Sequence, residues 1–345
     1  MVSLKKGLAV LAAVALLFSV AGCSSKPSSS EAPGTGSAKK VIKFGIGLND
    51  KSPQYKGLEK FKEIVEKESN GRFEVQLYHS SQLGDDVKLM EGLRMGTIEM
   101  TSPSTAPIAG LNKQFMVFDL PFLFPNEQVA DKVLDGPVGQ KLLDSLTDKG
   151  IIGLAYWENG YRQLTNSKRE VKTPEDLVGL KIRTMENPVH LASFRAMGAN
   201  PSPMPFGELF TAMEQNTIDG QENPLTTIYL QKYYEVQKYC TLTNHFYSPF
   251  VTMMSKKFWD GLSPEDQALM KKAALEAGAY ERQVNRQMMK EMADNLRQAG
   301  MTVTELTPEQ AEAFRKKTEG VAAQFEDQIG KDIIEAVKAE IAKNE

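Results

Sequence analysis

The sequence predicts an α/β protein of two domains that enclose a central cleft. Two stretches, 41–102 and 180–221, each read as strand, helix, strand, helix and strand. Strands that alternate with helices pair in parallel, so each stretch predicts a parallel sheet with helices of its own. A helical pattern of about 35 residues follows Ser263 and is too long for one compact layer. We expect this long helix to brace both domains.

In the first stretch the spacing of apolar residues changes between a period of two and a period of about 3.6. The expected strands are 41–48, 73–78 and 97–102, and the expected helices are 53–69 and 85–95. Gly71 and Gly96 end the two helices, as is typical of residues that adopt a left-handed backbone. Two short helical segments around Gly136 and Pro137 follow, and a buried strand is expected over 151–156.

The second stretch repeats this alternation. Its expected strands are 180–184, 201–204 and 218–221, and its expected helices are 188–197, 206–215 and 224–232. Two further strands, 239–243 and 250–255, flank a possible hinge segment. Ser263 and Pro264 are typical of the cap and first turn of a helix, here the long one. A last strand over 301–306 precedes a charged helical tail.

The first residues resemble a bacterial lipoprotein signal. Lys5 and Lys6 precede an apolar run shorter than the about 20 residues that span a membrane. The tetrad VAGC ending at Cys23 resembles a lipobox, so we expect a signal peptide over 1–22 and lipidation of Cys23, palmitate included. An ordinary cleaved signal with an incidental cysteine is the alternative. Residues 23–40 are rich in Ser, Pro and Gly and predict a flexible tether outside the cytoplasmic membrane.

Charge and cysteine content narrow the possible partners. The formal net charge is −3, and the leader removes two further positive charges, so neither nucleic acid nor an anionic membrane surface is indicated. With Cys23 in the anchor, Cys240 has no partner within the chain, and its strand-like context predicts core packing. The histidines lack companions at metal-ligand spacing, so the sequence predicts neither a metal site nor a cofactor.

Polar side chains at strand ends indicate an anion site in the cleft. Arg162 and Arg183 each end a short strand-like run, and Asn223 follows a third run directly before Pro224. Ligands of open α/β sheets bind beyond the carboxyl ends of the strands, where arginine offers a carboxylate a charged, bidentate fork. Ser104 follows the third strand of the first stretch and would face the same cleft, although turn or cap chemistry explains it equally well.

Structural interpretations of these residues stay open as well. Arg183 can instead pair with Glu186 or Asp176 at the surface, and Arg162 with Glu158. An asparagine before proline is also common in plain turns.

A series of ordered motifs resembles one protein family. These motifs are LG (83–84), DLPF (119–122), DGPVG (135–139), NGYR (159–162), GLKIR (179–183), GANP (198–201), DGQENP (219–224) and YEVQKY (234–239). Over 41–276 the chain resembles the dicarboxylate-binding type of solute-binding protein from tripartite ATP-independent periplasmic (TRAP) transporters. The resemblance implies a two-domain periplasmic-binding-protein (Venus-flytrap) fold, with domain I over 41–160 and 249–288 and domain II over 161–248 and 289–345.

The resemblance also implies roles for single residues. Arg183 matches the arginine that pairs with the ligand carboxylate, Arg162 matches a second arginine, and Phe206 matches an aromatic residue after a Pro-x-Pro turn. Together with polar side chains of the first domain and the interdomain segment, the expected ligand-binding residues are Arg183, Arg162, Asn223, Phe206, Ser104, Asn49, Ser52 and Glu158. Many members carry His-Pro in the first loop, where this chain has Ser52-Pro53.

We therefore expect an extracytoplasmic receptor that binds an organic acid and delivers it to the small and large membrane subunits of a TRAP permease, without catalysis. A receptor for an ABC-type importer or a sensor kinase would share the cleft and the anchor but not the motifs. A secreted α/β enzyme is the alternative from another class. The sequence lacks a Gly-x-Ser-x-Gly elbow and a phosphate-binding loop, although Glu158 and Glu222 could form an acid–base pair.

The ligand class follows from the neutral polar groups. The side chains that could contact ligand hydroxyls are Asn49, Gln54, Ser104, Thr105, Glu158, Gln221 and Asn223. A hydroxyl buried without a partner costs about 1 to 3 kcal/mol, so this abundance suits a polyhydroxylated acid. It favours a sugar acid such as a uronate slightly over a C4-dicarboxylate such as malate, succinate or fumarate.

Overall fold

The computed structural model describes residues 39–345. The predicted signal peptide 1–22, the lipidation of Cys23 and nearly all of the tether 23–40 lie outside the described residues and stay predictions. In the described part of the chain, none of the helices has the length and apolar character needed to cross a membrane.

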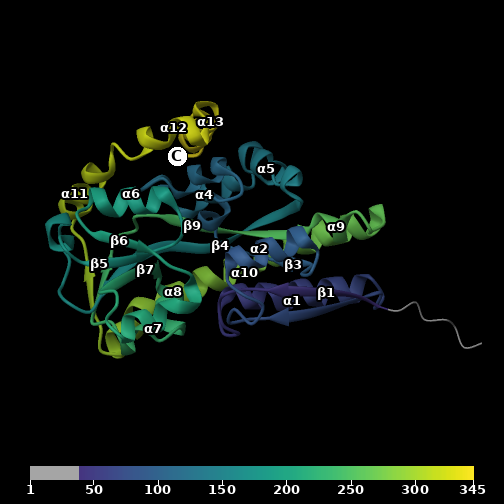
Figure 1. The fold of residues 1–345 in the computed structure, drawn as a ribbon, viewed down its shortest axis with the longest axis horizontal. Helices are drawn as coiled ribbons and strands as arrows, with labels where there is room; N and C mark the ends of the chain where they lie inside the picture. The colour runs from purple at the N-terminus through teal and green to yellow at the C-terminus, as the bar shows by residue number, and fades with distance from the viewer. Residues whose placement is uncertain (1–38) are drawn as a thin grey trace, which may run out of the picture. The chain divides into compact units, whose positions relative to one another are not determined.

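Strands and helices follow one another nearly as predicted (Figure 1). The strands are β1 (Lys40–Gly45), β2 (Phe73–Tyr78), β3 (Met100–Thr101), β4 (Ile151–Asn166), β5 (Lys181–Thr184), β6 (Asn200–Pro203), β7 (Gly220–Pro224), β8 (Tyr239–Leu242), β9 (Tyr247–Ser255) and β10 (Thr302–Glu305). The α-helices are α1 (Pro53–Glu68), α2 (Asp86–Met95), α3 (Thr105–Ile108), α4 (Glu127–Leu134), α5 (Pro137–Asp144), α6 (Pro188–Ala196), α7 (Leu209–Glu214), α8 (Leu225–Leu230), α9 (Lys256–Trp259), α10 (Pro264–Gln298), α11 (Pro308–Thr318), α12 (Glu326–Ile329) and α13 (Lys331–Asn344). Short 3-10 helices are η1 (Lys113–Asp119), η2 (Thr147–Lys149), η3 (Pro174–Leu177), η4 (Phe206–Glu208), η5 (Tyr233–Glu235) and η6 (Ala322–Phe325).

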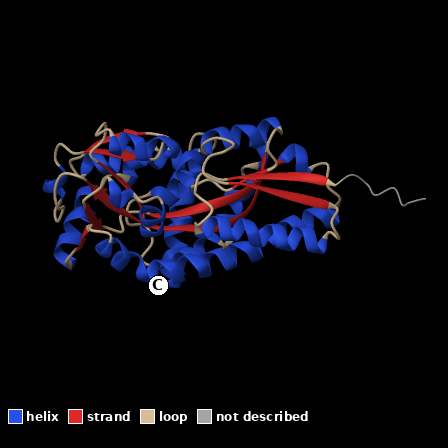
Figure 2. Ribbon diagram, turned by 90° about the horizontal axis from the view of Figure 1, so that it is seen from below, coloured by secondary structure: helices blue, strands red, loops and turns tan. Residues whose placement is uncertain are grey.

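The sheet consists of two parallel groups joined by antiparallel strands. Along the sheet the order is β2-β1-β3-β9-β4-β7-β5-β6, with β8 and β10 beside β4. β1 pairs in parallel with β2 and β3, and β5 pairs in parallel with β6 and β7, as the two strand-helix alternations predict. The long strands β4 and β9 pair antiparallel between these groups. Figure 2 shows long strands of the sheet running between the helices.

Strand β4 passes from one half of the sheet to the other without a break. It pairs with β9 as far as Tyr161 and with β7 from Arg162 onwards. A register shift between Glu158 and Gly160, with Gly160 at a φ of 106°, lets the strand bend there. The predicted strand over 151–156 is therefore too short, because Asn159 and Gly160 resemble a turn in sequence. Consequently Arg162 lies inside a strand, not at its end.

Helix α10 supports both halves of the sheet. Its N-terminal part places Leu269 and Ala273 in the core beneath β1 and α1, whereas Met292 and Leu296 belong to the core of α7 and α8. Figure 1 shows it running between α1 and α8. The chain thus has the two-part α/β fold with a bracing helix that the sequence predicts, while the residue boundaries of the two domains stay a prediction.

The interior contains the lone described cysteine. Cys240 is completely buried in the core of α7, α8 and β8, and burial raises the pKa of its thiol to about 12. This confirms the prediction of core packing.

Candidate functional site

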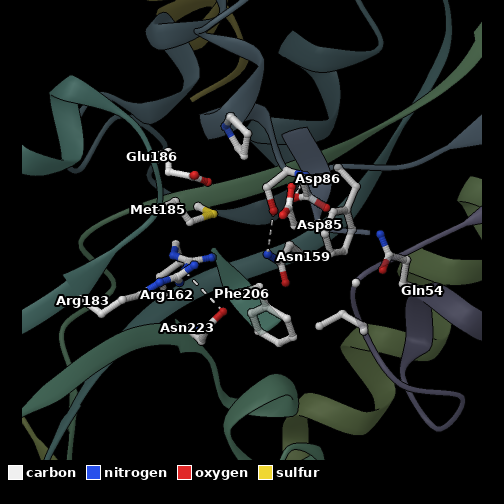
Figure 3. A pocket seen from close by; sticks show the side chains of 15 residues that line it. Gln54, Asp85, Asp86, Asn159, Arg162, Arg183, Met185, Glu186, Phe206 and Asn223 are labelled. Carbon is white, nitrogen blue, oxygen red and sulfur yellow. Dashed lines mark hydrogen bonds between the residues drawn. The ribbon is translucent and has the colours of Figure 1, made fainter. Parts of the chain in front are cut away.

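A cavity lies between the two halves, where both contribute side chains (Figure 3). Its volume is about 40 Å³. The lining residues are Gly47, Leu48, Gln54, Asp85, Asp86, Ser104, Pro107, Asn159, Arg162, Arg183, Met185, Glu186, Phe206, Asn223 and Phe250. Five of the predicted site residues, Arg162, Arg183, Asn223, Phe206 and Ser104, are therefore brought together here.

The sheet positions the two arginines together. Arg162 comes from β4 and Arg183 from β5, and both strands flank β7. In Figure 3 their guanidinium groups lie on one side of the cavity, close to Asn223 at the end of β7. Both arginines are buried, with 0% and 2% of their surface exposed.

Arg162 is fixed from behind by Glu222, the residue before Asn223. Its Nε and Nη2 donate to the Glu222 carboxylate, and Nη2 also donates to the Glu222 carbonyl at 2.6 Å and to Asn223 Oδ1 at 3.3 Å. Burial alone would raise the pKa of Glu222, but the Arg162 charge and hydrogen bonds from His245 and Arg162 hold it well below its usual range. The remaining nitrogen, Nη1, has no partner in the described chain.

Arg183 is oriented by a backbone carbonyl instead of an acid. Its Nε and Nη2 donate to Met204 O at 2.8 and 2.6 Å. Its Nη1 is buried and lacks a partner among the described residues, like that of Arg162. Burial lowers the pKa of Arg183, while the charge of Glu222 opposes this shift. A desolvated guanidinium with an open donor is chemically suited to bind an anion.

The surface pairings considered from the sequence are wrong. Arg162 pairs with Glu222 and not with Glu158, because β4 and β7 are direct neighbours. Among the described ion pairs, Arg183 has neither Glu186 nor Asp176 as a partner, and its Nε and Nη2 donate to Met204 O instead.

Three carboxylates line other parts of the same cavity. Asp85 and Asp86 start α2, and Glu186 follows β5 two residues after its end. In Figure 3 the aspartates lie across the cavity from the arginines. Burial raises the pKa of Asp86 to about 7, with the charges of Asp85 and Glu186 adding to the effect and a hydrogen bond from Ser104 N opposing it. These oxygens can accept hydrogen bonds from ligand hydroxyls.

The remaining wall is neutral. The Phe206 ring approaches Gly47, where an added Cβ would lie 3.7 Å from it, so a residue of the second half closes against a loop of the first. Asn159 Nδ2 donates to Ser104 Oγ at 3.4 Å, and Asn159 stands at the bend of β4. The site thus offers one apolar face and several hydrogen-bonding groups.

The other predicted residues, Asn49, Ser52 and Glu158, line an adjoining smaller chamber. Asn49 Nδ2 donates to Leu230 O at 3.0 Å, and Ser52 caps α1 by accepting from Tyr55 N. Asn49 and Ser52 thus make local structural contacts, and all three residues line the adjoining chamber instead of the main cavity.

Glu158 is already occupied by protein donors. Its Oε2 accepts from Tyr247 Oη at 3.0 Å and from Arg286 Nε at 2.9 Å, and its Oε1 accepts from Asn285 Nδ2 at 3.0 Å. Glu222 is likewise used by Arg162. The two carboxylates suggested as an acid–base pair are thus both engaged in structural contacts.

Several lining residues were not singled out from the sequence as site residues. Asp85 and Asp86 follow β2 through a loop at its carboxyl end, and Glu186 follows β5, so the strand-end rule that indicated Arg183 would also have indicated them. Asn159 carries no such signal because it lies inside β4 at a bend. Among the described residues, a group of three or more His, Cys, Asp or Glu suited to a metal ion is absent.

Comparisons with known proteins identify the family of this chain. The family model described as bacterial extracellular solute-binding protein, family 7, matches residues 44–328. The 2,3-diketo-L-gulonate-binding periplasmic protein YiaO of Escherichia coli is 39% identical over 86% of this chain and 89% of its own length. The C4-dicarboxylate-binding periplasmic protein DctP of Rhodobacter capsulatus is 36% identical over 88% and 91%, respectively.

A solved structure shares the fold closely. The sugar acid binding protein of Advenella mimigardefordensis in complex with galactonate superimposes with a TM-score of 0.87 at 46% identity, covering 89% of this chain and 99% of that one. Proteins of this kind are substrate-binding receptors of transporters and not enzymes. The chain belongs to family 7 of the bacterial extracellular solute-binding proteins, the periplasmic receptors of TRAP transporters.

Proposed function

We propose that this receptor binds a sugar acid with a single carboxylate, and that Arg162 and Arg183 hold the carboxylate through their open Nη1 atoms. The observation that carries the proposal is the pair of buried guanidinium nitrogens without partners on one side of the cavity. Arginine binds a carboxylate through parallel N–H groups, so two such donors suit one carboxylate group.

Charge balance favours one ligand carboxylate over two. Glu222 already compensates Arg162, so the two arginines and Glu222 together carry one net positive charge. Asp85, Asp86 and Glu186 also line the cavity, and in Figure 3 the two aspartates lie across it from the arginines. A second ligand carboxylate would meet these acids, whereas ligand hydroxyls would donate hydrogen bonds to them. Buried like charges disfavour a partner by several kcal/mol.

The relatives include both kinds of receptor. The names of the similar proteins refer to galactonate, 2,3-diketo-L-gulonate and C4-dicarboxylates. A C4-dicarboxylate is the second candidate, because two buried arginines could each take one carboxylate. The pairing of Arg162 with Glu222 argues against it.

A thermal-shift screen tests the ligand class. The protein with Cys23→Ser would be heated with D-galactonate, D-gluconate, D-galacturonate, D-glucuronate, malate and succinate. A ligand at about one hundred times its Kd adds about 2.7 kcal/mol of stability. We expect sugar acids to raise the Tm of this protein. They should not raise the Tm of the same protein with Arg183→Ala. A larger shift with succinate or malate than with every sugar acid would contradict the proposal.

We further propose that the loaded receptor delivers its ligand to the membrane subunits of a TRAP permease while tethered through Cys23. The family supports the permease, and the lipobox-like tetrad supports the anchor. Cell fractionation tests the anchor, because Cys23→Ser should move the protein from the membrane to the soluble fraction. Equal membrane retention of both forms would refute it.

A further inference from the structure

A side chamber lined by residues of helix α10 adjoins the main cavity. The two spaces share Gln54 and Asn159 in their walls, so they are neighbours. Its lining includes Glu281 and Asn285 of α10, and Thr226 and Leu230 of α8. Its volume is about 10 Å³, which is room for about one water-sized group.

Glu281 lines this chamber and carries a polar atom without a partner among the described residues. Its side chain is 0% exposed, its Oε2 accepts from Glu158 N at 2.9 Å, and its Oε1 has no partner among the described residues. Burial raises the pKa of this carboxyl well above its usual range. In its protonated form, which burial favours, the group can donate a hydrogen bond from Oε1.

Gln54 presents the complementary free atom. It is 2% exposed, and its Nε2 donates to Ser102 O at 2.6 Å, which fixes the amide so that Oε1 is the open end. That Oε1 also lacks a partner in the described chain. In Figure 3 Gln54 lies on the side of the cavity away from Arg162 and Arg183, so a chain held at the arginines would extend towards it.

We propose that the side chamber receives one hydroxyl group of the bound sugar acid, which accepts from Glu281 and donates to Gln54. Only a group that both donates and accepts satisfies this pair of atoms: a carboxylate cannot donate to the glutamine oxygen, and a methyl group leaves both atoms unpaired. This inference rests on the proposed function and extends it, because it assigns Glu281 and Gln54 the recognition of one particular hydroxyl of the sugar acid.

The test is a double-mutant cycle between side chain and ligand hydroxyl. The probes are the aldonate that stabilises the wild type most in the screen and its monodeoxy analogues, each titrated by calorimetry. We expect one analogue to bind the wild type about tenfold or more weakly than the parent acid, because it leaves both buried atoms unpaired. Glu281→Met should weaken the parent by a similar factor and no longer distinguish it from that analogue.

Matched variants separate hydrogen bonding from packing. Glu281→Gln keeps a neutral group that accepts from Glu158 N and donates into the chamber, so its affinity for the parent should stay within about threefold of the wild type. Glu276→Met controls for a new methionine on an exposed face of the same helix. If Glu281→Met does not fold, Gln54→Met supplies the same cycle from the opposite wall.

The outcomes distinguish the two proposals. For each monodeoxy analogue, the loss of affinity relative to the parent aldonate is compared between the wild type and Glu281→Met or Gln54→Met. If an aldonate binds but these losses are the same in the variants as in the wild type, the chamber does not hold a ligand hydroxyl. That result would overturn this inference. If no sugar acid binds the wild type, and Arg183→Ala leaves the response to every acid in the screen unchanged, the proposed function is wrong. The inference, which rests on it, is then wrong as well.

Discussion

Glu222 binds the guanidinium of Arg162 from behind, and both side chains are completely buried. The pair comes from neighbouring strands, β4 and β7, where Arg162 is opposite Pro224 and Glu222 lies two residues before Pro224 on β7. By occupying Nε and Nη2, Glu222 leaves only Nη1 of Arg162 for a ligand. The pair therefore sets both the direction and the net charge of the site.

Breaking this pair should destabilise the protein. Glu222→Gln leaves the Arg162 charge buried without a counterion, so we expect a loss of about 3 to 5 kcal/mol in the free energy of unfolding at neutral pH. Urea denaturation without ligand measures it. Glu91→Gln, an exposed position on α2, serves as control and should stay within about 0.5 kcal/mol. A loss below about 1 kcal/mol for Glu222→Gln would mean that the pair contributes little.

Arg183 should dominate affinity. Removing one partner of a buried charged hydrogen bond costs about 2 to 5 kcal/mol, so Arg183→Ala should weaken D-galactonate binding at least about thirtyfold. Arg183→Lys should recover only part of it, because lysine lacks the fork. Arg169→Ala is the matched control, since Arg169 also donates to backbone carbonyls but is exposed. Calorimetry on the three variants decides the point, and equal losses for Arg169→Ala and Arg183→Ala would contradict it.

Asp86 should make stability depend on pH. Its pKa is about 7 in the fold and about 4 in the unfolded chain, so between these values the folded protein holds a proton that the unfolded chain has released. Its contribution is therefore complete below about pH 4 and decreases as the pH rises to about 7. Asp86→Asn should flatten this part of the curve of Tm against pH.

The neighbouring acid provides the control for this prediction. Asp85 adds to the raised pKa of Asp86, and Asp85→Asn keeps the α2 cap because asparagine caps equally well. We expect this variant to move the sloping region to lower pH without abolishing it. An unchanged profile in Asp86→Asn would show that another group titrates.

Glu158 should affect stability more than affinity. Both of its oxygens accept from protein donors, including Arg286 and Asn285 of α10. Glu158→Gln weakens charged hydrogen bonds worth about 1.5 to 3 kcal/mol, so the urea midpoint should fall while D-galactonate affinity stays within about threefold. A tenfold loss of affinity at unchanged stability would instead make Glu158 a ligand contact, as the sequence suggested.

The alternation of strands and helices was predictable because local patterns determine it. The parallel groups β1–β3 and β5–β7 follow from apolar periodicity and glycine punctuation alone. The extent of β4 was not predictable. The bend at Gly160 has the local composition of a turn, and it stays in the sheet because it pairs with β9, which lies far along the chain.

The site was predictable in part for the same reason. Arg183 and Asn223 lie near strand ends, where a general rule of α/β sheets applies. The partner of Arg162 depends on which strands are neighbours, and sequence proximity indicated Glu158 where the sheet supplies Glu222. The strand-end rule applies equally to Asp85, Asp86 and Glu186, but their meeting in one cavity depends on how the two halves of the sheet come together.

One comparison tests the central claim most directly: calorimetric titration of the protein with D-galactonate, galactarate and galactitol. These share hydroxyl configurations but carry one, two and no carboxylates. The arginine pair requires one carboxylate and the acids opposite it disfavour a second, so galactonate should bind about tenfold or more tightly than either of the others. Binding of galactarate as tight as that of galactonate, with succinate also bound, would contradict a site built for one carboxylate.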